Sequence, residues 1–569
     1  MSRMRIVRRP IPEPAAHGQW PASWPPLLRR LHAARGSDGI AQAMPRLADL
    51  PSPEGLLDVQ AAVALLRQAI AEDWRIVVTA DFDCDGASAC AVAVRGLRML
   101  GARDVRYVVP DRVVHGYGLT PALVDLIAPL APRLLLTVDH GIACHAGIDS
   151  ARARGWRVIV TDHHLPGETL PDADAVIDPN RPGDAFPAKA LAGVGVLFYL
   201  LLALRAALRD AGEAGGQADL ASLLDLVAVG TVADMVPLDV ANRALVGAGT
   251  RRIREGKACA GLQALIAVSG RDARRLTTAD IGYGIAPRIN AAGRLEDMRL
   301  GIECLLTDDP LRASELAATL HEINAQRRDL QDTMVDDAIA AVSAKTEGLA
   351  LAPCLHHADW HPGVIGLVAS RLKEHLHRPV LAFAPSGNGD GRLRGSARSI
   401  PGFHMRDAIA LVDARHPRLI ERFGGHAMAA GLTIAEGQLP GFVTAFQDVA
   451  RERGVEALLQ PSIDSDGGLP AEALDIAHAI ALRDGGAWGQ GYPEPQFDDE
   501  FELLEWRQVA ATHLRLHLQR EGRRFTAMHF GGWDGTPPPP RLRIVYRLVP
   551  DDWRGGDAVQ LIVAHRLPA

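Results

Sequence analysis

The stretch Arg75-Ile76-Val77-Val78-Thr79-Ala80-Asp81-Phe82-Asp83-Cys84-Asp85-Gly86 joins an apolar run to three closely spaced carboxylates. A short, continuous apolar run predicts a strand that is buried on both faces. In an extended backbone, Asp81, Asp83 and Asp85 would point to one face and share a small volume. Because three anions at this spacing repel one another, the sequence predicts a bound cation.

The pattern of these acids narrows the kind of site. D-x-D-x-D-G also begins the calcium loop of an EF-hand, which requires a glutamate at its twelfth position and a helix on each side. The twelfth position is Val92, and a strand precedes the loop, so an EF-hand is excluded. A solvated acidic turn is the remaining alternative, and it suits one or two acids better than three.

Other apolar runs also end at polar residues. Residues 133–138 precede Asp139-His140-Gly141, residues 156–161 precede Asp162-His163-His164, and the runs 105–109 and 175–177 end beside Asp111 and Asp178. Apolar strands separated by helical stretches predict an α/β fold with a parallel sheet. Ligands bind at the carboxyl ends of such strands. An aspartate there can also cap a helix, but three such ends favour a metal site.

These motifs, taken in order, resemble those of the DHH phosphoesterases. The fourth motif of that family is matched by Gly230-Thr231-Val232-Ala233-Asp234. Within the family the chain is similar to the RecJ-type single-strand-specific exonucleases, and the similarity runs from about residue 50 to the C-terminus. The segments that carry it are Pro110 to Arg112 with Gly116 to Leu119, Leu191 to Gly195, Pro287 to Arg294, Trp360 to Gly363, Gly395 to Ser399 and Phe423 to Gly431.

The resemblance implies a metal-dependent exonuclease that degrades single-stranded DNA from its 5′ end to mononucleotides, in repair and recombination. It implies two Mn²⁺ or Mg²⁺ ions, and it carries the ligand role onto Asp83, Asp85, Asp139, His163 and Asp234. We expect Asp81 to be a further ligand or an acceptor behind the ligands. Carboxylates with one imidazole suit these ions better than zinc. Water activated by two ions removes the need for a serine or cysteine nucleophile.

Two histidines beside the expected ligands have open roles. We expect His164 to contact the scissile phosphate, and the alternative is a hydrogen bond to a ligand. His140 stands where the similar exonucleases usually have asparagine, and it either donates to a phosphate or orients Asp139. Tyr492 is a second departure, because asparagine is usual there as well.

An exonuclease must also recognise a strand end. Arginines and backbone amides of small residues suit a terminal 5′-phosphate, so we expect Ser396 and Arg398 to bind it, with Arg112. The resemblance adds Arg288. His361, Gly425 and His426 are expected along the nucleotide path, although the glycines of this segment could instead be packing residues. Tyr117, Trp360 and Phe403 are candidates for base stacking, with core packing as the alternative.

The composition of the chain is compatible with these expectations. The formal net charge of −7 does not exclude nucleic acid, because binding depends on local positive charge. The longest apolar run, residues 191–204, is shorter than the ~20 residues that span a bilayer, so we expect a buried helix and no membrane partner. Six cysteines without C-x-x-C pairs indicate reduced thiols and a cytoplasmic protein.

Composition shifts predict five segments. They are an extended N-terminal arm (1–48), a catalytic α/β domain (49–304), a long connecting helix (305–348), a second α/β lobe with the glycine-rich motif (349–460) and a β-barrel (461–569). The resemblance implies that the barrel is an OB-fold. Single-stranded DNA is the expected partner, with a helicase and a single-strand-binding protein as candidates.

Two alternatives belong to other classes. One is a DHH phosphodiesterase of short oligoribonucleotides or cyclic dinucleotides, or a manganese pyrophosphatase; such enzymes lack the barrel and the segment 395–399. The other is an inactive scaffold that binds single strands, which would have lost metal ligands, whereas this chain retains them.

Overall fold

The computed structural model describes residues 4–111, 115–343, 349–387, 389–552 and 554–569. The chain divides into two compact units. The larger unit contains Ile6–Gly293, Asp297–His321 and Asp464–Ala569, and the smaller unit is mainly Glu322–Ile463. Each unit has its own sheet and its own apolar core.

A parallel five-stranded sheet forms the centre of the larger unit's first part, as predicted. Its strands are β2 (Ile76–Ala80), β3 (Val105–Val108), β4 (Leu134–Val138), β5 (Arg157–Thr161) and β6 (Ala175–Ile177). Their order is β3-β2-β4-β5-β6, and every neighbouring pair is parallel. All carboxyl ends therefore lie at one edge of the sheet.

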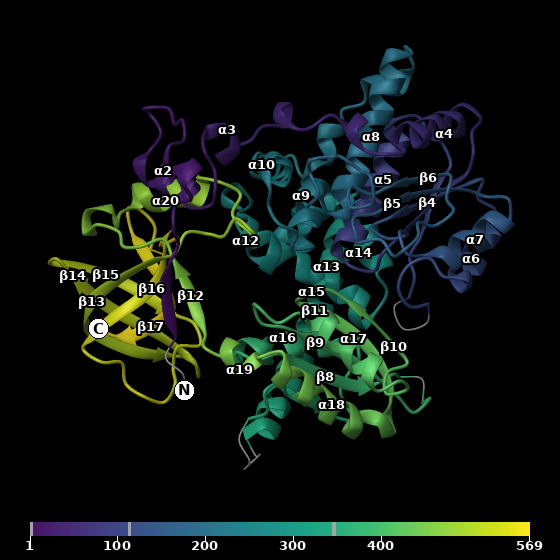
Figure 1. Cartoon of the computed structure of the whole chain (residues 1–569). Helices are drawn as coiled ribbons and strands as arrows, with labels where there is room; N and C mark the ends of the chain where they lie inside the picture. Colours follow the sequence, from purple (N-terminus) through teal and green to yellow (C-terminus); the bar gives the residue numbers. More distant parts are fainter. Residues whose placement is uncertain (1–3, 112–114, 344–348, 388, 553) are drawn as a thin grey trace. The chain divides into compact units, whose positions relative to one another are not determined.

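Helices cover both faces of this sheet (Figure 1). Ile76 and Val78 pack toward one face, whose helices are α4 (Val59–Ala71), α5 (Cys84–Met99) and α8 (Gly193–Asp210). Val77, which alternates with them, packs toward the other face, with α6 (Pro121–Ile127) and α7 (His145–Ala153). Burial on both faces explains why the strands are continuously apolar.

Further helices extend the larger unit beyond the sheet. They are α9 (Leu224–Ala233), α10 (Val240–Arg254), α11 (Ala260–Ser269), α12 (Thr278–Asp280), a π-helical turn (Ile281–Ile285), α13 (Ala286–Leu295) and α14 (Arg299–Leu306). The predicted long helix is α15 (Pro310–Ser343), which begins at a proline because the first helical turn needs no N–H donor there. No described helix is long and apolar enough to cross a membrane.

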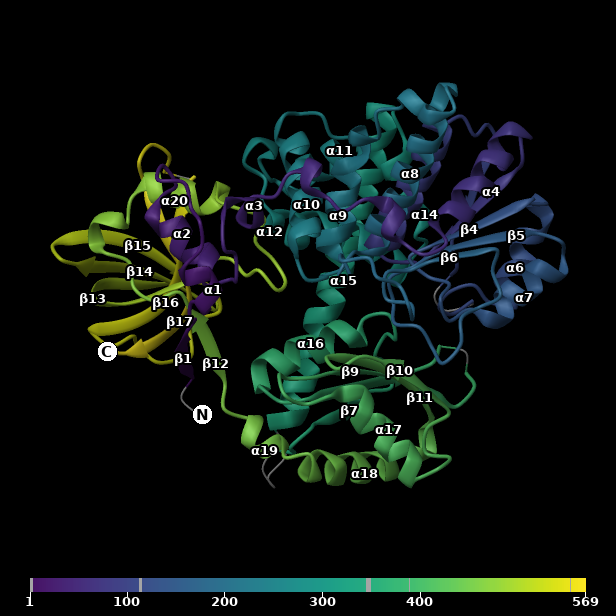
Figure 2. The same cartoon turned by 45° about the horizontal axis from the view of Figure 1, so that its top comes forward.

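The smaller unit is the predicted second α/β lobe (Figure 2). Its sheet has the order β10-β11-β9-β8-β7, and only β7 and β8 are parallel. The strands are β7 (Cys354–His356), β8 (Val380–Pro385), β9 (Arg392–Arg398), β10 (Arg422–Gly425) and β11 (Ala429–Ala435). The helices are α16 (Ile365–Leu376), α17 (Met405–Arg415), α18 (Leu439–Glu452) and α19 (Val455–Leu458).

The C-terminal strands close into the predicted barrel, with the order β13-β14-β15-β17-β16. They are β13 (Phe497–Val509), β14 (His513–Arg520), β15 (Arg523–His529), β16 (Arg541–Pro550) and β17 (Val559–Pro568), and α20 (Ile476–Asp484) precedes them. The turn at Glu521-Gly522 joins β14 to β15, and both residues have positive φ.

The expected extended N-terminal arm is partly helical. Helix α2 (Pro26–Ala33) buries Leu28 and Leu31 in the core of the barrel. Helices α1 (Glu13–Ala16) and α3 (Ile40–Ala43) are single turns, and β1 (Arg5–Arg8) and β12 (Ser462–Ser465) form a separate two-stranded sheet. A composition rich in proline and arginine concealed the apolar stripe of α2.

Tyr492, the second departure from the similar exonucleases, belongs to the same region. Its hydroxyl lies 2.7 Å from His32 Nδ1 and 2.8 Å from Ser37 Oγ. The guanidinium carbon of Arg243, on α10, lies 3.8 Å from the centre of its ring. Tyr492 therefore links the N-terminal segment to the helices beyond the sheet.

Candidate metal centre

The three acids of the opening motif lie on a turn and not along a strand. Strand β2 ends at Ala80 and α5 begins at Cys84, so the predicted extended backbone through Asp85 is wrong. Asp83 caps the helix by accepting a hydrogen bond of 3.0 Å from the Gly86 amide. Asp85 lies in the first helical turn.

The carboxylates nevertheless converge with the other predicted ligands. Within each of three groups, one possible ligand atom per residue lies within 4.8 Å of the others. The groups are Asp81, Asp83 and Asp139; Asp85, His163 and Asp234; and Asp139, His163 and His164. The ends of β2, β4 and β5, the first turn of α5 and the C-terminal end of α9 supply these side chains.

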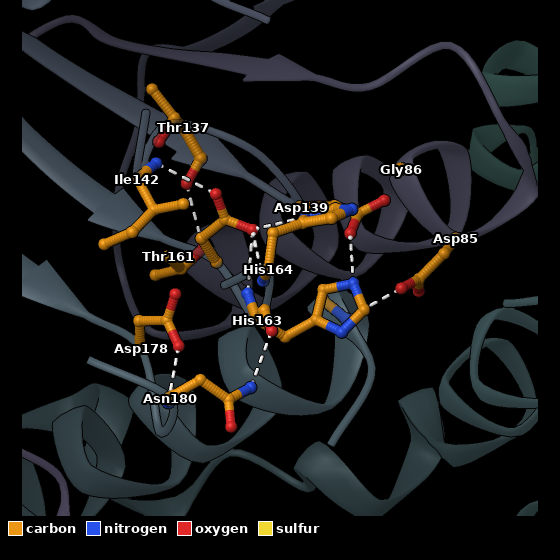
Figure 3. Close-up of polar contacts among 12 residues, drawn as sticks. Asp85, Gly86, Thr137, Asp139, Ile142, Thr161, His163, His164, Asp178 and Asn180 are labelled. Carbon is orange, nitrogen blue, oxygen red and sulfur yellow. Dashed lines mark hydrogen bonds and ion pairs between the residues drawn. The ribbon is translucent and has the colours of Figure 1, made fainter. Parts of the chain in front are cut away.

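His163 lies between two of the acids. Its Nε2 atom is 3.2 Å from Asp139 Oδ1 and 3.5 Å from Asp234 Oδ2, and Figure 3 shows the imidazole and the Asp139 carboxylate turned toward each other. Both Nε2 and Asp139 Oδ1 are buried without a hydrogen bond to any described residue. Buried polar atoms that face each other without a hydrogen bond are expected of ligands that share a cation. The donor set therefore fits the implied ions.

Charge crowding supports the same conclusion. Burial, followed by the charge of neighbouring carboxylates, raises the pKa of both Asp85 and Asp139 well above the usual range. Burial also raises the pKa of Asp234. Ionised carboxylates this close need positive charge, which divalent ions would provide.

Two glycines leave space for the ligands. A Cβ atom on Gly193 would lie 2.3 Å from Asp139 Oδ1, and one on Gly230 would lie 2.7 Å from Asp85 Oδ1. The Gly193 amide donates to Asp85 Oδ2 at 2.7 Å, and the Val194 amide donates to Oδ1 at 3.1 Å. The first turn of α8 thus orients Asp85, a role that the sequence did not reveal.

The sequence analysis assigned no role to Asp162, although this residue belongs to the third motif. Its Oδ1 accepts hydrogen bonds from the His163 and His164 amides and, at 2.7 Å, from His164 Nδ1. Its Oδ2 accepts from the Ile142 amide at 2.9 Å. Burial opposes ionisation, but the bonds from His164 outweigh it and hold the pKa of Asp162 below its usual range. Asp162 therefore fixes both following histidines, and its place at a strand end was the available signal.

His164 is paired with this carboxylate and partly exposed. Burial lowers its pKa, but the hydrogen bond and charge of Asp162 prevail and raise it to about 9. The hydroxyl of Tyr117 lies 3.4 Å from the ring nitrogens. Tyr117 is 42% exposed and stays a candidate for base stacking.

A second support reaches His163 from the loop that follows β6. The side chain of Asn180 donates from Nδ2 to the His163 carbonyl oxygen at 2.7 Å. The backbone N–H of Asn180 donates to the Asp178 carboxylate, also at 2.7 Å. Figure 3 shows Asp178 and Asn180 beside His163. Asn180 carried no signal in the sequence, because its contact is with backbone.

His140 fits neither expected role. Its side chain is fully buried, and neither ring nitrogen forms a hydrogen bond with Asp139 or another side chain in the described chain. Burial lowers the pKa of His140 to about 4, so the ring is neutral near neutral pH.

The predicted phosphate residues of the smaller unit form a compact group. On β9, Arg398 Nη1 donates to Ser396 Oγ at 3.1 Å. A Cβ atom on Gly366, in the first turn of α16, would lie 3.0 Å from both Ser396 Oγ and Arg398 Nη2. The two side chains therefore lie against the N-terminal end of a helix, where anions are favoured.

The other predicted contacts vary. His361 Nδ1 accepts from the Gly363 amide at 3.1 Å, Gly425 has a φ of 137° that favours glycine, and His426 is exposed. Trp360, only 5% exposed, and Phe403 are buried in apolar cores, so base stacking is wrong for both.

Two predicted arginines of the larger unit remain. Arg288 is 7% exposed, and its Nε lies 3.2 Å from His321 Nδ1. Arg112 lies outside the described residues.

Comparison with known families assigns three regions. Residues 75–231 match the model of the DHH family, N-terminal domain; residues 339–452 match the DHHA1 domain; and residues 465–565 match the RecJ OB domain.

The similarity to curated proteins covers the whole chain. The single-stranded-DNA-specific exonuclease RecJ of Dickeya dadantii is 45% identical over 99% of this chain and 100% of its own length. The protein of the same name in Escherichia coli is 42% identical over 100% of this chain and 99% of its own.

Two solved structures are also similar over the full chain. RecJ of Thermus thermophilus in complex with Mn²⁺ superposes with a TM-score of 0.80 at 31% identity, covering 100% of this chain and 80% of that one. RecJ in complex with Mg²⁺ from the same organism gives a TM-score of 0.75 at 28% identity, covering 100% and 78%.

Proposed function

The chain belongs to the RecJ family of single-stranded-DNA-specific exonucleases, and we propose that the clustered acids and His163 are its hydrolytic centre. The protein is a metal-dependent hydrolase that degrades single-stranded DNA from the 5′ end, and Mn²⁺ or Mg²⁺ is its cofactor. One observation supports the location most: Asp139 Oδ1 and His163 Nε2 face each other at 3.2 Å, buried and without a hydrogen bond to a described residue, among further carboxylates.

The chain's own residues divide the metal-binding task. Asp85, His163 and Asp234 would hold one ion, and Asp81, Asp83 and Asp139 the other. When bound, such a pair of ions supplies an activated water and stabilises charge on the leaving oxygen. Asp162, Asn180 and the first turn of α8 keep the ligand side chains in place.

In this proposal His164 donates a hydrogen bond to the scissile phosphate. Because its Nδ1 proton is donated to Asp162, Nε2 remains for a phosphate oxygen. An imidazolium held by a carboxylate donates a charge-assisted hydrogen bond, which strengthens as charge develops on the phosphate.

Ser396 and Arg398 are the proposed 5′-phosphate site. A terminal phosphate carries more charge than an internal one, and this pair offers a hydroxyl, a guanidinium and a helix N-terminus. His361, Gly425 and His426 remain predicted along the nucleotide path. Arg288 and Arg112 stay predictions as phosphate contacts.

The alternatives are less favourable. The full-length similarity and the OB-domain match disfavour an oligoribonucleotide or cyclic-dinucleotide phosphodiesterase and a pyrophosphatase. An inactive scaffold is disfavoured because every expected ligand is present and clustered. The role in repair and recombination, the helicase and single-strand-binding partners, the cytoplasmic location and the domain boundaries stay predictions.

An end-labelling experiment tests this function. Single-stranded DNA and RNA, each labelled at one end, are incubated with the protein, with and without Mn²⁺. We expect mononucleotides to be released from the 5′ end of DNA only when metal is present. Release from the 3′ end, or equal activity in EDTA, would contradict the proposal.

A further inference from the structure

A cavity of about 370 Å³ opens in the larger unit, away from the metal centre. It lies where the C-terminal end of α5 meets the N-terminal end of α9, together with residues from α10 and the end of α14. Its volume is within the range of small-molecule sites. Neither the family motifs nor the proposed mechanism uses it.

Positive charge predominates in the lining. Arg95, Arg98, Arg252 and Lys257 contribute cations, against the carboxylates of Asp225 and Asp308. Asp308 is already paired with Arg95 at 2.8 Å, and the ammonium of Lys257 is paired with Glu255 at 2.7 Å on the exposed side.

Two of these arginines keep unused donors. Arg98 donates to the Val105 carbonyl and Arg252 to the Lys257 carbonyl, and neither forms an ion pair with a carboxylate in the described part of the chain. Their remaining N–H groups suit an anion that binds through oxygen atoms.

An unpaired acceptor lies in the same cavity. Asp225 is only 1% exposed; its Oδ2 accepts from the Cys259 amide at 2.8 Å, whereas its Oδ1 has no hydrogen bond to a described residue. The Nε atom of Arg252 is buried and unbonded in the same way. Unpaired buried polar atoms are costly, so a ligand that meets both would be stabilised.

We propose that this cavity is a second nucleotide site, which binds a nucleoside 5′-phosphate. The phosphate lies on Arg98, Arg252 and Lys257, and an N–H group of the base donates to Asp225 Oδ1. A nucleoside without a phosphate group would lack the contacts with the cations, and inorganic phosphate would lack the contact with Asp225, so each should bind more weakly than the nucleotide.

The cavity is connected to the metal ligands through two helices. Helix α5 carries Asp85 in its first turn and Arg98 in its last, and α9 carries Asp225 in its first turn and leads to Asp234. At 1.5 Å per residue, the segment from Asp85 to Arg95 spans about 15 Å. Two packed helices thus join the cavity to the metal ligands. If the proposed function holds, the bound ligand belongs to the class of the enzyme's own product.

Binding to the full-length protein in EDTA tests the site without hydrolysis. Calorimetry would compare dGMP with inorganic phosphate and with deoxyguanosine. Because dGMP also carries the 5′-phosphate that Ser396 and Arg398 are proposed to bind, these titrations use the Arg398→Ala variant. In that variant we expect one dGMP per chain, bound about 10-fold or more tightly than either fragment. No binding of dGMP, or equal affinities for dGMP and phosphate, would overturn the nucleotide assignment.

Substitutions of exposed residues that line the cavity test the location of the site. We expect Lys257→Glu and Arg98→Ala each to weaken dGMP binding by about 10-fold, and both residues are exposed, so the fold should persist. Arg251→Glu is the matched control, because Arg251 is exposed on α10 and does not line the cavity. Equal loss in all three variants would overturn the assignment.

A separate variant distinguishes the two proposals. Asp139→Ala should abolish hydrolysis and leave dGMP binding in EDTA unchanged. Loss of dGMP binding in Asp139→Ala would place the nucleotide at the metal centre and overturn the second site, whereas the proposed function is decided by hydrolysis alone.

Discussion

At the scale of single residues, Asp162 is the side chain whose role the structure changes most. It holds His164 through Nδ1 and both histidine amides through the same oxygen. We predict that Asp162→Asn lowers kcat roughly 10- to 100-fold at saturating Mn²⁺. The reason is that an uncharged asparagine side chain accepts the hydrogen bond from His164 Nδ1 more weakly than a carboxylate does. Initial rates on single-stranded DNA measure the change.

A double-mutant cycle separates this role from a general loss of structure. If Asp162 acts through His164, Asp162→Asn should have little further effect in a His164→Ala background. Asp172→Asn is the control, since its side chain is 80% exposed on a neighbouring loop. Effects of Asp162→Asn and His164→Ala that multiply in full would contradict the positioning role.

The sequence predicted the ligands better than it predicted their geometry. Strand periodicity placed Asp81, Asp83 and Asp85 on one face, but Asp83 is a helix cap and Asp85 is helical. An aspartate before a helix is a known cap, so that signal was present. The contacts of Gly193 and Gly230 with carboxylates far away in the chain could not be predicted, because they depend on how helices pack on the sheet.

At the scale of elements, β9 and α16 together form the proposed end-recognition site. We predict that Arg398→Ala slows degradation of 5′-phosphorylated strands about 10-fold more than that of 5′-hydroxyl strands. Gly366→Ala should act in the same direction, because its Cβ would lie 3.0 Å from the Ser396 hydroxyl and from Arg398 Nη2. The ratio of the two degradation rates is the measurement.

The control for this prediction lies on the same helix. Arg371→Ala removes a guanidinium that is 65% exposed and pairs with Glu374 at 3.7 Å. The ratio should be unchanged in that variant. Equal slowing of both kinds of strand by Arg398→Ala would show that Arg398 does not sense the end.

The parallel sheet, the long α15 and the barrel followed from the patterns in the sequence. Helix α2 was missed, because its apolar residues pack against a barrel that is distant in the sequence. Most of the stability of a short helix comes from the tertiary packing of its apolar face, which the sequence alone does not show.

At the scale of the whole molecule, His32 makes stability depend on pH. The ring is fully buried, lies 2.7 Å from the Tyr492 hydroxyl and 2.8 Å from the Gly485 carbonyl oxygen, and stacks on Trp488. Burial lowers its pKa to about 4. In the unfolded chain the pKa is about 6.5, so acid protonates the unfolded state first.

Stability should therefore fall as the pH falls below about 6.5, and this contribution should level off below about pH 4. We predict that His32 accounts for about 3 kcal/mol between pH 7 and pH 4. Urea unfolding of the wild type and of His32→Gln at several pH values measures this share. An identical pH dependence in the two proteins would contradict the prediction.

The central claim is that the clustered acids and His163 hold two catalytic ions. Anomalous diffraction from crystals soaked in Mn²⁺ tests it most directly. We predict two manganese peaks among Asp81, Asp83, Asp85, Asp139, His163 and Asp234 in the wild type. Asp139→Ala should lose at least one peak and its hydrolysis, while strand binding persists. Manganese absent from this cluster, or full Mn²⁺-dependent activity in Asp139→Ala, would contradict the account.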